Sequence, residues 1–180
     1  MIVIMSKGLA DRLWKLRGRE QRLHASGILF RAGDPVLSLF LVAAGTLELL
    51  RALPHGSRLT LQRAGPGAIL AEASLFADRY HCDATAVDDS ILHVVPRRRV
   101  RAALREDPDF ASALMRHLAH EVTRARAQAE TLSLKTVAER LDAWLTLNGG
   151  LLPPRGRRRQ VASDIGVTPE ALYRELARRR

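Results

Sequence analysis

Between residues 28 and 95 the hydrophobic positions form short runs, some continuous and some alternating with polar residues. These runs lie at 28–30, 37–42, 46–50, 58–61 and 91–95. Turn-forming residues separate them, at 32–35, 44–45, 54–57 and 65–67. Many short strands separated by Gly- and Pro-containing turns are typical of an antiparallel sandwich or jelly roll. The first half of the chain is therefore predicted to be an antiparallel β-roll.

Helical patterns flank this region. Residues 6–24 predict a short basic amphipathic helix with Leu9, Leu13, Trp14 and Leu16 facing inward. After Pro96, residues 97–105 predict a second short helix. The β-roll is thus expected between a leading helix and a helical C-terminal half.

One long helix is predicted from residue 108 onward. Asp107, Pro108 and Asp109 provide a start signal, and no Gly or Pro occurs from Phe110 to Lys135. A helix of roughly 28 residues would be about 40 Å long. Apolar residues recur along it at intervals of three or four: Leu114, Leu118, Val122, Ala125, Ala129 and Leu132. This near-heptad seam predicts a dimerisation helix, with packing on the chain's own sheet as the alternative.

The C-terminal residues predict three further helices. Residues 137–147 form an amphipathic pattern whose apolar side is Leu141, Trp144, Leu145 and Leu147. Residues 160–180 predict a helix, a tight turn at Gly166 and a helix that Thr168 caps. The expected contact between these last two helices consists of Val161, Ala162, Ile165, Val167, Leu172 and Leu176. The pattern predicts a helix-turn-helix, although two short helices packed as core give the same pattern.

Charge favours nucleic acid as the partner. The net charge is +10, and arginines at 155 and 157–159 directly precede the first of these two helices. Such a cluster suits contact with phosphates, whereas the alternative is a solvated basic surface. The second helix is expected to present Glu170, Tyr173, Arg174, Arg178 and Arg179 outward, as a recognition helix does.

Other classes of protein are disfavoured. The single cysteine excludes an intrachain disulfide framework and any cluster held by several cysteines of one chain. No apolar run reaches the length of about 18 residues that a membrane span needs, so a cytoplasmic protein without membrane contact is expected. The histidines at 24, 55, 81 and 93 do not supply a cupin-type metal site, and no catalytic motif is evident. We therefore expect the chain not to be an enzyme.

The order of these elements, together with local sequence, resembles a known family. The matching stretches are RAGDP at 31–35, LFLVAAGTLEL at 39–49, GPGAILAEASLF at 65–76 and VASDIGVTPEALYREL at 161–176. They resemble the cyclic-AMP receptor protein/fumarate-nitrate regulator (Crp/Fnr) family of bacterial transcription factors. The resemblance implies an α+β chain with a β-roll effector-sensing domain at 1–106, a dimerisation helix at 107–136 and a helix-turn-helix domain at 137–180.

The same resemblance implies a homodimer that reads palindromic DNA, with RNA polymerase as a candidate partner. The implied DNA-binding residues lie at the start and along the outer face of the last helix: Thr168, Pro169, Glu170, Tyr173, Arg174 and Arg178. Glu170 can accept a hydrogen bond from a cytosine amino group, and Arg174 can pair with guanine or phosphate. Pro169 stands where cyclic-AMP-responsive members have a basic residue, so a different half-site is expected.

The effector site departs from the family pattern of Gly-Glu-x-x-Leu followed by Arg-Ser/Thr-Ala. The glycine is Ala71 here, and His81, Cys82 and Asp83 stand where the arginine segment is expected. The candidate effector-binding residues are Glu72, Ser74, Leu75, Arg79, His81 and Cys82. Cyclic-nucleotide binding, metal or redox sensing around Cys82, and a purely structural cysteine remain open, so no metal or cofactor is assigned.

A second function is also open. Family members carry a two-stranded wing after the recognition helix, and this sequence ends at Arg180. The alternative is therefore a cyclic-nucleotide-binding-like sensor or partner-binding module with weak or no DNA binding.

Overall fold

The structure is a computed structural model that describes residues 7–53 and 58–179. The chain divides into two compact units, one ending at Leu118 and the other formed from Ala119 onward. Among the described residues, no helix combines the length and hydropathy needed to cross a membrane.

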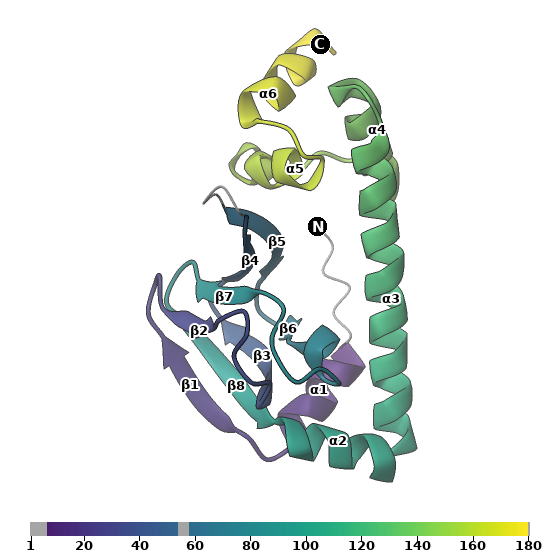
Figure 1. Ribbon diagram of the computed structural model, residues 1–180. Coiled ribbons are helices and arrows are strands. Elements are labelled where there is room, and N and C mark those ends of the chain that lie inside the picture. Colours follow the sequence, from purple (N-terminus) through teal and green to yellow (C-terminus); the bar gives the residue numbers. More distant parts are fainter. Residues whose placement is uncertain (1–6, 54–57, 180) are drawn as a thin grey trace. The chain divides into compact units, whose positions relative to one another are not determined.

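The first unit is built on two four-stranded antiparallel sheets (Figure 1). In one sheet the strand order is β1 (Arg19–Leu23), β8 (Ser90–Pro96), β3 (Ser38–Ala44), β6 (Ile69–Leu70). In the other it is β2 (Ile28–Phe30), β7 (Asp83–Ala86), β4 (Leu47–Ala52), β5 (Arg58–Ala64). The predicted antiparallel β-roll is confirmed, and each of the five predicted runs lies in a strand or begins one residue before it.

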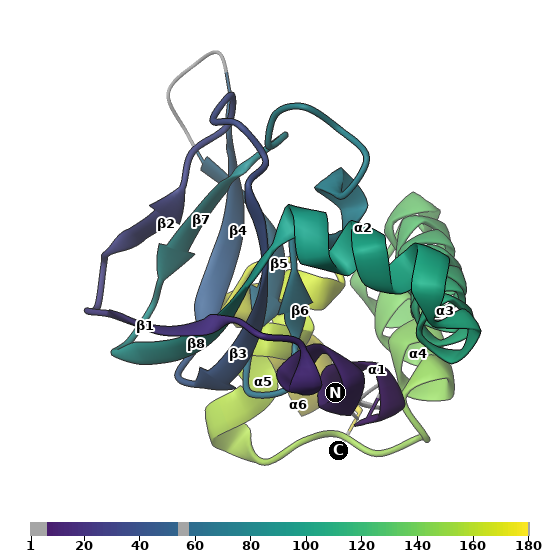
Figure 2. The ribbon, with the colours of Figure 1, turned by 90° about the horizontal axis from the view of Figure 1, so that it is seen from below.

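Alternation along the strands builds two apolar layers in this unit. Phe40 and Val42 of β3 point between the sheets, where Leu47 and Ala84 of the opposite sheet meet them. Leu39 and Leu41, one position out of phase, lie on the other face of β3. That face is covered by α1 (Lys7–Lys15), α2 (Arg97–Glu106) and the first turns of α3 (Pro108–Ser133), as Figure 2 shows from below.

Turns and caps agree with the sequence signals. Gly33, Gly45 and Gly67 have φ of +90°, +82° and +84°, the left-handed region that glycine enters without steric cost. The Asp107 carboxylate accepts hydrogen bonds from the backbone N–H groups of Asp109 and Phe110, both at 3.0 Å, and so caps α3. The turn predicted at 54–57 lies outside the described residues.

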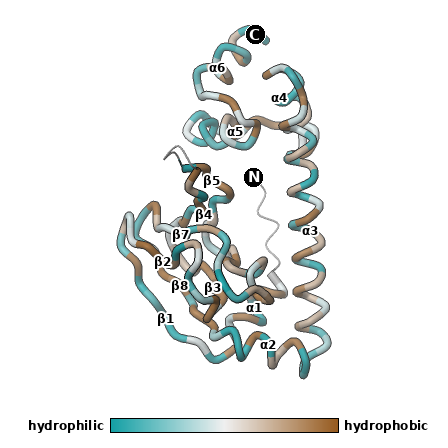
Figure 3. The backbone as a smooth tube through the Cα atoms, viewed as in Figure 1, coloured by the Kyte–Doolittle hydropathy of each residue, from teal (hydrophilic) through white to brown (hydrophobic). Residues whose placement is uncertain are grey.

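The prediction of one helix over 6–24 is wrong in its second half. Helix α1 ends at Lys15, and Arg19–Leu23 form β1, which pairs with β8. A Cβ at Gly18 would lie 2.5 Å from the Val94 carbonyl oxygen, so the chain can approach β8 only because glycine stands there. Strand β1 is almost wholly hydrophilic (Figure 3), which conceals it from a hydrophobic-pattern analysis.

Trp14 was predicted to face inward and does not. Its side chain is 55% exposed and lies against the His93 ring in a tilted arrangement, with ring centroids 4.7 Å apart. Strands β6 and β7 were not predicted, since the first has two residues and the second, Asp-Ala-Thr-Ala, carries only small apolar side chains.

The second unit contains the later turns of α3, then α4 (Val137–Leu147), the 3₁₀ turn η2 (Arg155–Arg157), α5 (Arg158–Asp164) and α6 (Pro169–Arg178). Helix α4 begins with a capping box, in which Thr136 and Glu139 each bond the other's backbone N–H. The bounds of α3, α4 and α6 agree closely with the sequence expectation, because strong start signals mark each of them.

Candidate DNA-binding interface and effector site

Helices α5 and α6 form the expected helix-turn-helix, and Gly166 is the residue that permits the turn. Its φ is +65°, and a Cβ there would lie 2.6 Å from the Leu132 side chain. Arg140 of α4 braces the turn by donating from Nη1 to the carbonyl oxygens of Ile165 and Gly166, at 3.2 and 3.3 Å. A side chain at position 166 would therefore be strained twice, by its backbone and by its neighbour.

A compact apolar core holds the two helices on α4. Its buried members are Leu141, Trp144, Val161, Ala162, Ile165 and Leu172, with Leu145, Leu152, Val167 and Leu176 packed against them. The Trp144 indole donates to Asp164 at 3.2 Å, so the ring's polar atom is satisfied. All six residues predicted for the contact between the helices lie in this core. Leu147, also predicted to face it, is 57% exposed and does not.

The start of α6 combines a cap with an exposed carboxylate. The Thr168 hydroxyl accepts from the Ala171 N–H at 3.2 Å, and Pro169 occupies the first turn. Hydrogen bonds from its own backbone N–H and from the Thr168 hydroxyl hold the pKa of Glu170 below its usual range. Glu170 is exposed and stays ionised near neutral pH, which is the form that accepts a hydrogen bond from a base amino group.

The outer face of α6 carries the remaining predicted DNA-binding side chains. Tyr173 is 40% exposed, and Arg174 and Arg178 are also exposed. Arg178 pairs with Glu175 at 2.7 Å. The structure therefore brings all six predicted residues onto the start and one face of a single capped helix.

Arg179, which was predicted to point outward with them, turns back instead. It donates to Glu175 at 2.7 Å, to the carbonyl oxygen of Ala138 at 3.0 Å, and to Asp142 of α4. These two carboxylates raise the pKa of Arg179, and the guanidinium in turn lowers the pKa of Asp142. Arg179 therefore anchors the end of α6 to α4 rather than offering a charge to a ligand.

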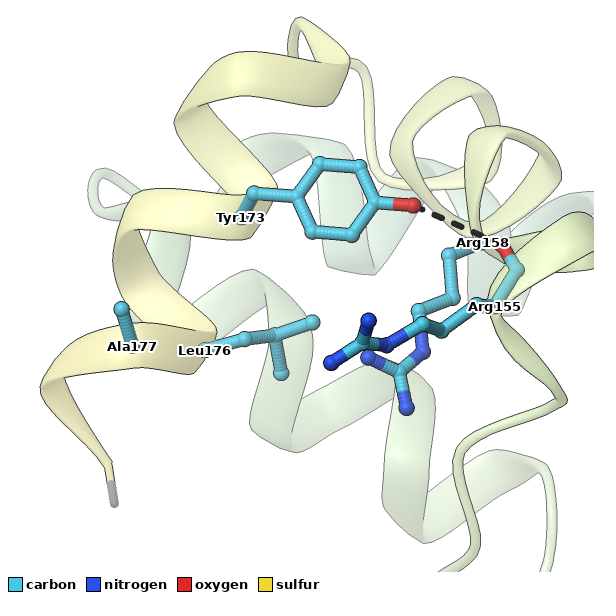
Figure 4. Close-up of a pocket in the computed structure, with 5 residues that line it drawn as sticks. All are labelled: Arg155, Arg158, Tyr173, Leu176 and Ala177. Atoms are coloured by element: carbon cyan, nitrogen blue, oxygen red, sulfur yellow. Dashed lines mark hydrogen bonds between the residues drawn. The ribbon is translucent and has the colours of Figure 1, made fainter.

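Arginines of η2 and of the start of α5 lie beside α6. The Tyr173 hydroxyl donates to the carbonyl oxygen of Arg155 at 3.4 Å, which ties η2 to α6. Arg155, Arg158, Tyr173, Leu176 and Ala177 line a cleft of about 380 Å³ (Figure 4). The positive cluster predicted from the sequence is thus next to α6, on the same compact unit.

The six candidate effector residues are not one open site. Ser74 and Leu75 are buried at 2% and 1% exposure, and the Ser74 hydroxyl bonds His81 Nδ1 at 3.0 Å. Arg79 is exposed and donates to the Gly33 carbonyl oxygen at 2.6 Å. Glu72 begins the 3₁₀ turn η1 (Glu72–Ser74), directly after Ala71. Ala71, at the position of the family's glycine, has φ of +70°, so it keeps the glycine conformation without being glycine.

Cys82 is part of the core between the two sheets, at 2% exposure. Burial raises the pKa of its thiol, and the charge of Arg51 on β4 only partly opposes that effect. The neighbouring Asp83 accepts from the Ala32 N–H at 2.8 Å and so holds a turn. The residues at the family's phosphate-binding segment therefore serve the roll's own structure, and they do not match the pattern that holds a cyclic phosphate. Across residues 7–53 and 58–179, no group of three or more His, Cys, Asp or Glu side chains could hold a metal ion.

Comparison with known proteins gives the family. The cyclic nucleotide-binding domain family matches residues 20–107. The cyclic AMP receptor protein of Thermus thermophilus is 31% identical over 162 residues, which are 87% of this chain and 75% of that protein. The chain belongs to the Crp/Fnr family of transcription regulators. Membership confirms the resemblance noted in the sequence.

Other Crp/Fnr relatives match across most of the chain. The transcriptional activator protein anr of Pseudomonas aeruginosa is 23% identical over 178 residues, 93% of this chain and 73% of the relative. The structure of FixK2 from Bradyrhizobium japonicum covers 91% of this chain and 84% of its own, with a TM-score of 0.72 and 22% identity. The catabolite activator protein of Thermus thermophilus covers 98% and 83%, with a TM-score of 0.59 and 27% identity.

Two features of the sites were missed by sequence reasoning. Glu175 is 8% exposed and binds both Arg178 and Arg179, although a glutamate within a short amphipathic helix gives no signal of burial. The second feature is the tie between Tyr173 and Arg155, which joins residues far apart in the sequence. The i,i+3 and i,i+4 spacings of Glu175 to its arginines were the only available hint.

Proposed function

We propose that this Crp/Fnr chain acts as a homodimer that binds palindromic DNA, each subunit inserting α6 into the major groove of one half-site. The observation that carries the proposal is the position of Glu170, Tyr173 and Arg174 on the exposed face of α6. The carboxylate of Glu170 can accept hydrogen bonds from base edges, and the Arg174 guanidinium can donate them. Both groups lie on a capped helix that Arg179 anchors to α4. Arg157 and Arg159, both exposed, add the cationic surface that phosphates require.

Leu114 and Leu118 of the predicted seam pack on the first unit's own core, as the alternative had it, so dimerisation is proposed along the later part of α3. Val122 is 49% exposed and Leu132 is 39% exposed, and Ala125 and Ala129 between them are exposed as well. An apolar stripe of this spacing on a helix in water favours pairing with the same stripe of a second copy. Two copies would bring two α6 helices to one operator.

The β-roll is the proposed sensor of the signal that controls this activity. The first turns of α3 pack on the roll, and the same helix continues into the second unit. A signal at the roll therefore has a physical connection to α5 and α6. RNA polymerase is the proposed protein partner at promoters, because the chain belongs to a family of transcription regulators.

The test is selection of bound fragments from random DNA, followed by mobility shifts across a salt series. Affinity should fall by at least about tenfold between roughly 50 and 200 mM salt. Arg174→Ala should weaken the selected site by about 1–3 kcal/mol and relax the base preference at one position. Arg98→Ala, which removes an exposed charge from α2, is the matched control and should change little. A failure to enrich any sequence, with weak binding even at low salt, would support the alternative of a sensor or partner-binding module.

A further inference from the structure

The cleft between η2, the start of α5 and the outer side of α6 has two chemically different walls. Figure 4 shows the guanidinium groups of Arg155 and Arg158 next to each other on one side, with Leu176, Ala177 and the Tyr173 ring opposite them. Within the described residues neither arginine forms an ion pair with a carboxylate; Arg158 Nε donates to the Pro153 carbonyl oxygen at 3.3 Å. The repulsion between two adjacent positive charges is reduced when an anionic group binds between them.

We propose that this cleft binds an acidic segment of a partner protein, with one apolar side chain of that segment seated against Leu176 and Ala177. The two arginines would hold carboxylates on either side of the apolar residue. This is a second binding function, in addition to DNA reading, and the two surfaces share Tyr173.

The apolar wall decides between a peptide and the DNA backbone as the occupant. A phosphate is satisfied by cations and N–H donors, and it gains nothing from a hollow lined by leucine, alanine and the face of a tyrosine ring. A leucine or phenylalanine side chain removes apolar surface from water when it packs there, and it fits within a volume of about 380 Å³. Charge complementarity and the apolar surface therefore both favour a segment in which acidic and apolar residues alternate.

The composition of the lining fits a protein contact. Tyrosine and arginine are the side chains that most often dominate the binding energy at protein interfaces, and Tyr173 is already positioned by its hydrogen bond to the Arg155 carbonyl oxygen. The cleft is small, so a dissociation constant of about 10–100 µM is expected for an isolated peptide.

The proposal is tested with the full chain and a fluorescein-labelled peptide of about ten residues in which leucines alternate with aspartates. Fluorescence anisotropy gives its affinity, and a second peptide with serine in place of each leucine keeps the charge. We expect the serine peptide to bind at least about tenfold more weakly. Ala177→Trp, which fills the cleft and keeps both arginines, and the double variant Arg155→Ala/Arg158→Ala should each lose at least about tenfold in affinity. Arg98→Ala is the control for loss of one exposed charge, and circular dichroism checks the fold of each variant.

Three results would overturn the proposal: no binding of the leucine peptide, equal binding of both peptides, or binding that neither cleft variant reduces. Mobility shifts of the same variants on the selected operator test whether the cleft binds DNA phosphate instead of a peptide. If the double arginine variant loses operator affinity and keeps peptide affinity, the cleft is a phosphate site and the proposal is wrong. If the chain binds no DNA but shows the expected peptide pattern, the DNA-reading function fails and this inference stands.

Discussion

Single residues at the roll show how the Crp/Fnr framework has been retained with different side chains. Ala71 adopts a φ of +70° at the position of the family's glycine, and Cys82 is buried in the segment where the family pattern has Arg-Ser/Thr-Ala. The glycine-like backbone conformation is kept at Ala71, while the side chains of the segment differ from the family pattern. These two residues allow the structural account of the roll to be tested.

Replacing Ala71 with glycine should stabilise the protein. Alanine in the left-handed region costs about 1–2 kcal/mol, and glycine removes that cost. Part of this gain is offset because glycine gives the unfolded chain more conformational entropy to lose on folding. We expect Ala71→Gly to raise the free energy of unfolding by about 0.5–1 kcal/mol in urea denaturation. Ala73→Gly, at an exposed position of the same turn, should have the opposite sign. A destabilised Ala71→Gly protein would show that the strain is not present.

The Cys82 thiol should be unreactive in the folded protein. Burial keeps its pKa raised, so the thiolate that attacks disulfide reagents is scarce at neutral pH, and the side chain is only 2% exposed. We expect no labelling by Ellman's reagent at pH 8 over an hour, and complete labelling once urea unfolds the chain. Rapid labelling of the native protein would instead favour a redox-sensing role for this cysteine.

At the scale of elements, local signals predicted some parts and not others. Capped helices were predictable, because Thr136 with Glu139 and Thr168 with Pro169 determine a helix start within a few residues. The run at 37–42 was predictable as a strand because β3 is apolar on both faces, and both faces are covered. Strand β1 was not predictable, since its place in the sheet depends on pairing with β8, about seventy residues away, and on the absence of a side chain at Gly18.

Of the two candidate sites, one could be predicted from local sequence and the other could not. The start of α6 could be predicted because Thr168 to Arg174 act within one helical turn or two. The effector segment could not, because the roles of Ser74, His81 and Cys82 depend on which side of the roll each side chain faces. Only the folded sheets determine that.

The altered segment at 71–83 predicts weak or undetectable binding of cyclic AMP and cyclic GMP. Cys82 supplies no cation, and Asp83 would add a negative charge near a cyclic phosphate. We expect no heat of binding in isothermal titration calorimetry up to about 1 mM nucleotide. The cyclic AMP receptor protein of Thermus thermophilus, titrated alongside, is the positive control. A micromolar dissociation constant for this chain would show that another residue, such as Arg51, holds the phosphate.

The helix-turn-helix unit should lose stability in acid. Hydrogen bonds from Thr136 lower the pKa of Glu139, and Arg179 lowers the pKa of Asp142. Carboxylates with lowered pKa stabilise the fold fully above their unfolded values, near 4 to 4.5, and this stability is lost as the pH falls through the lower folded values. Urea unfolding followed by circular dichroism should therefore have a lower midpoint at about pH 3 than at pH 7. Asp142→Asn should already be less stable at pH 7 and should show a smaller pH dependence; an unchanged pH dependence would contradict the role given to Asp142.

At the scale of the whole molecule, the account depends on two copies joining along α3. Val122→Glu should shift the protein toward monomer, because a charge would be buried in the apolar seam. Sedimentation velocity at about 10 µM should detect the shift. The control is His120→Glu, which places the same charge at an exposed position on the opposite side of the helix. A wild-type protein that is already monomeric under these conditions would refute the proposed dimer.

The most direct measurement of the central claim is hydroxyl-radical footprinting of the intact protein on its selected operator. Two copies of α6 reading one palindrome should protect two half-sites whose centres lie about 10 base pairs, or a multiple of that, apart. Arg174→Ala should weaken both protected regions equally. A single protected region without a symmetric partner, or no sequence-specific protection at low salt, would contradict the account.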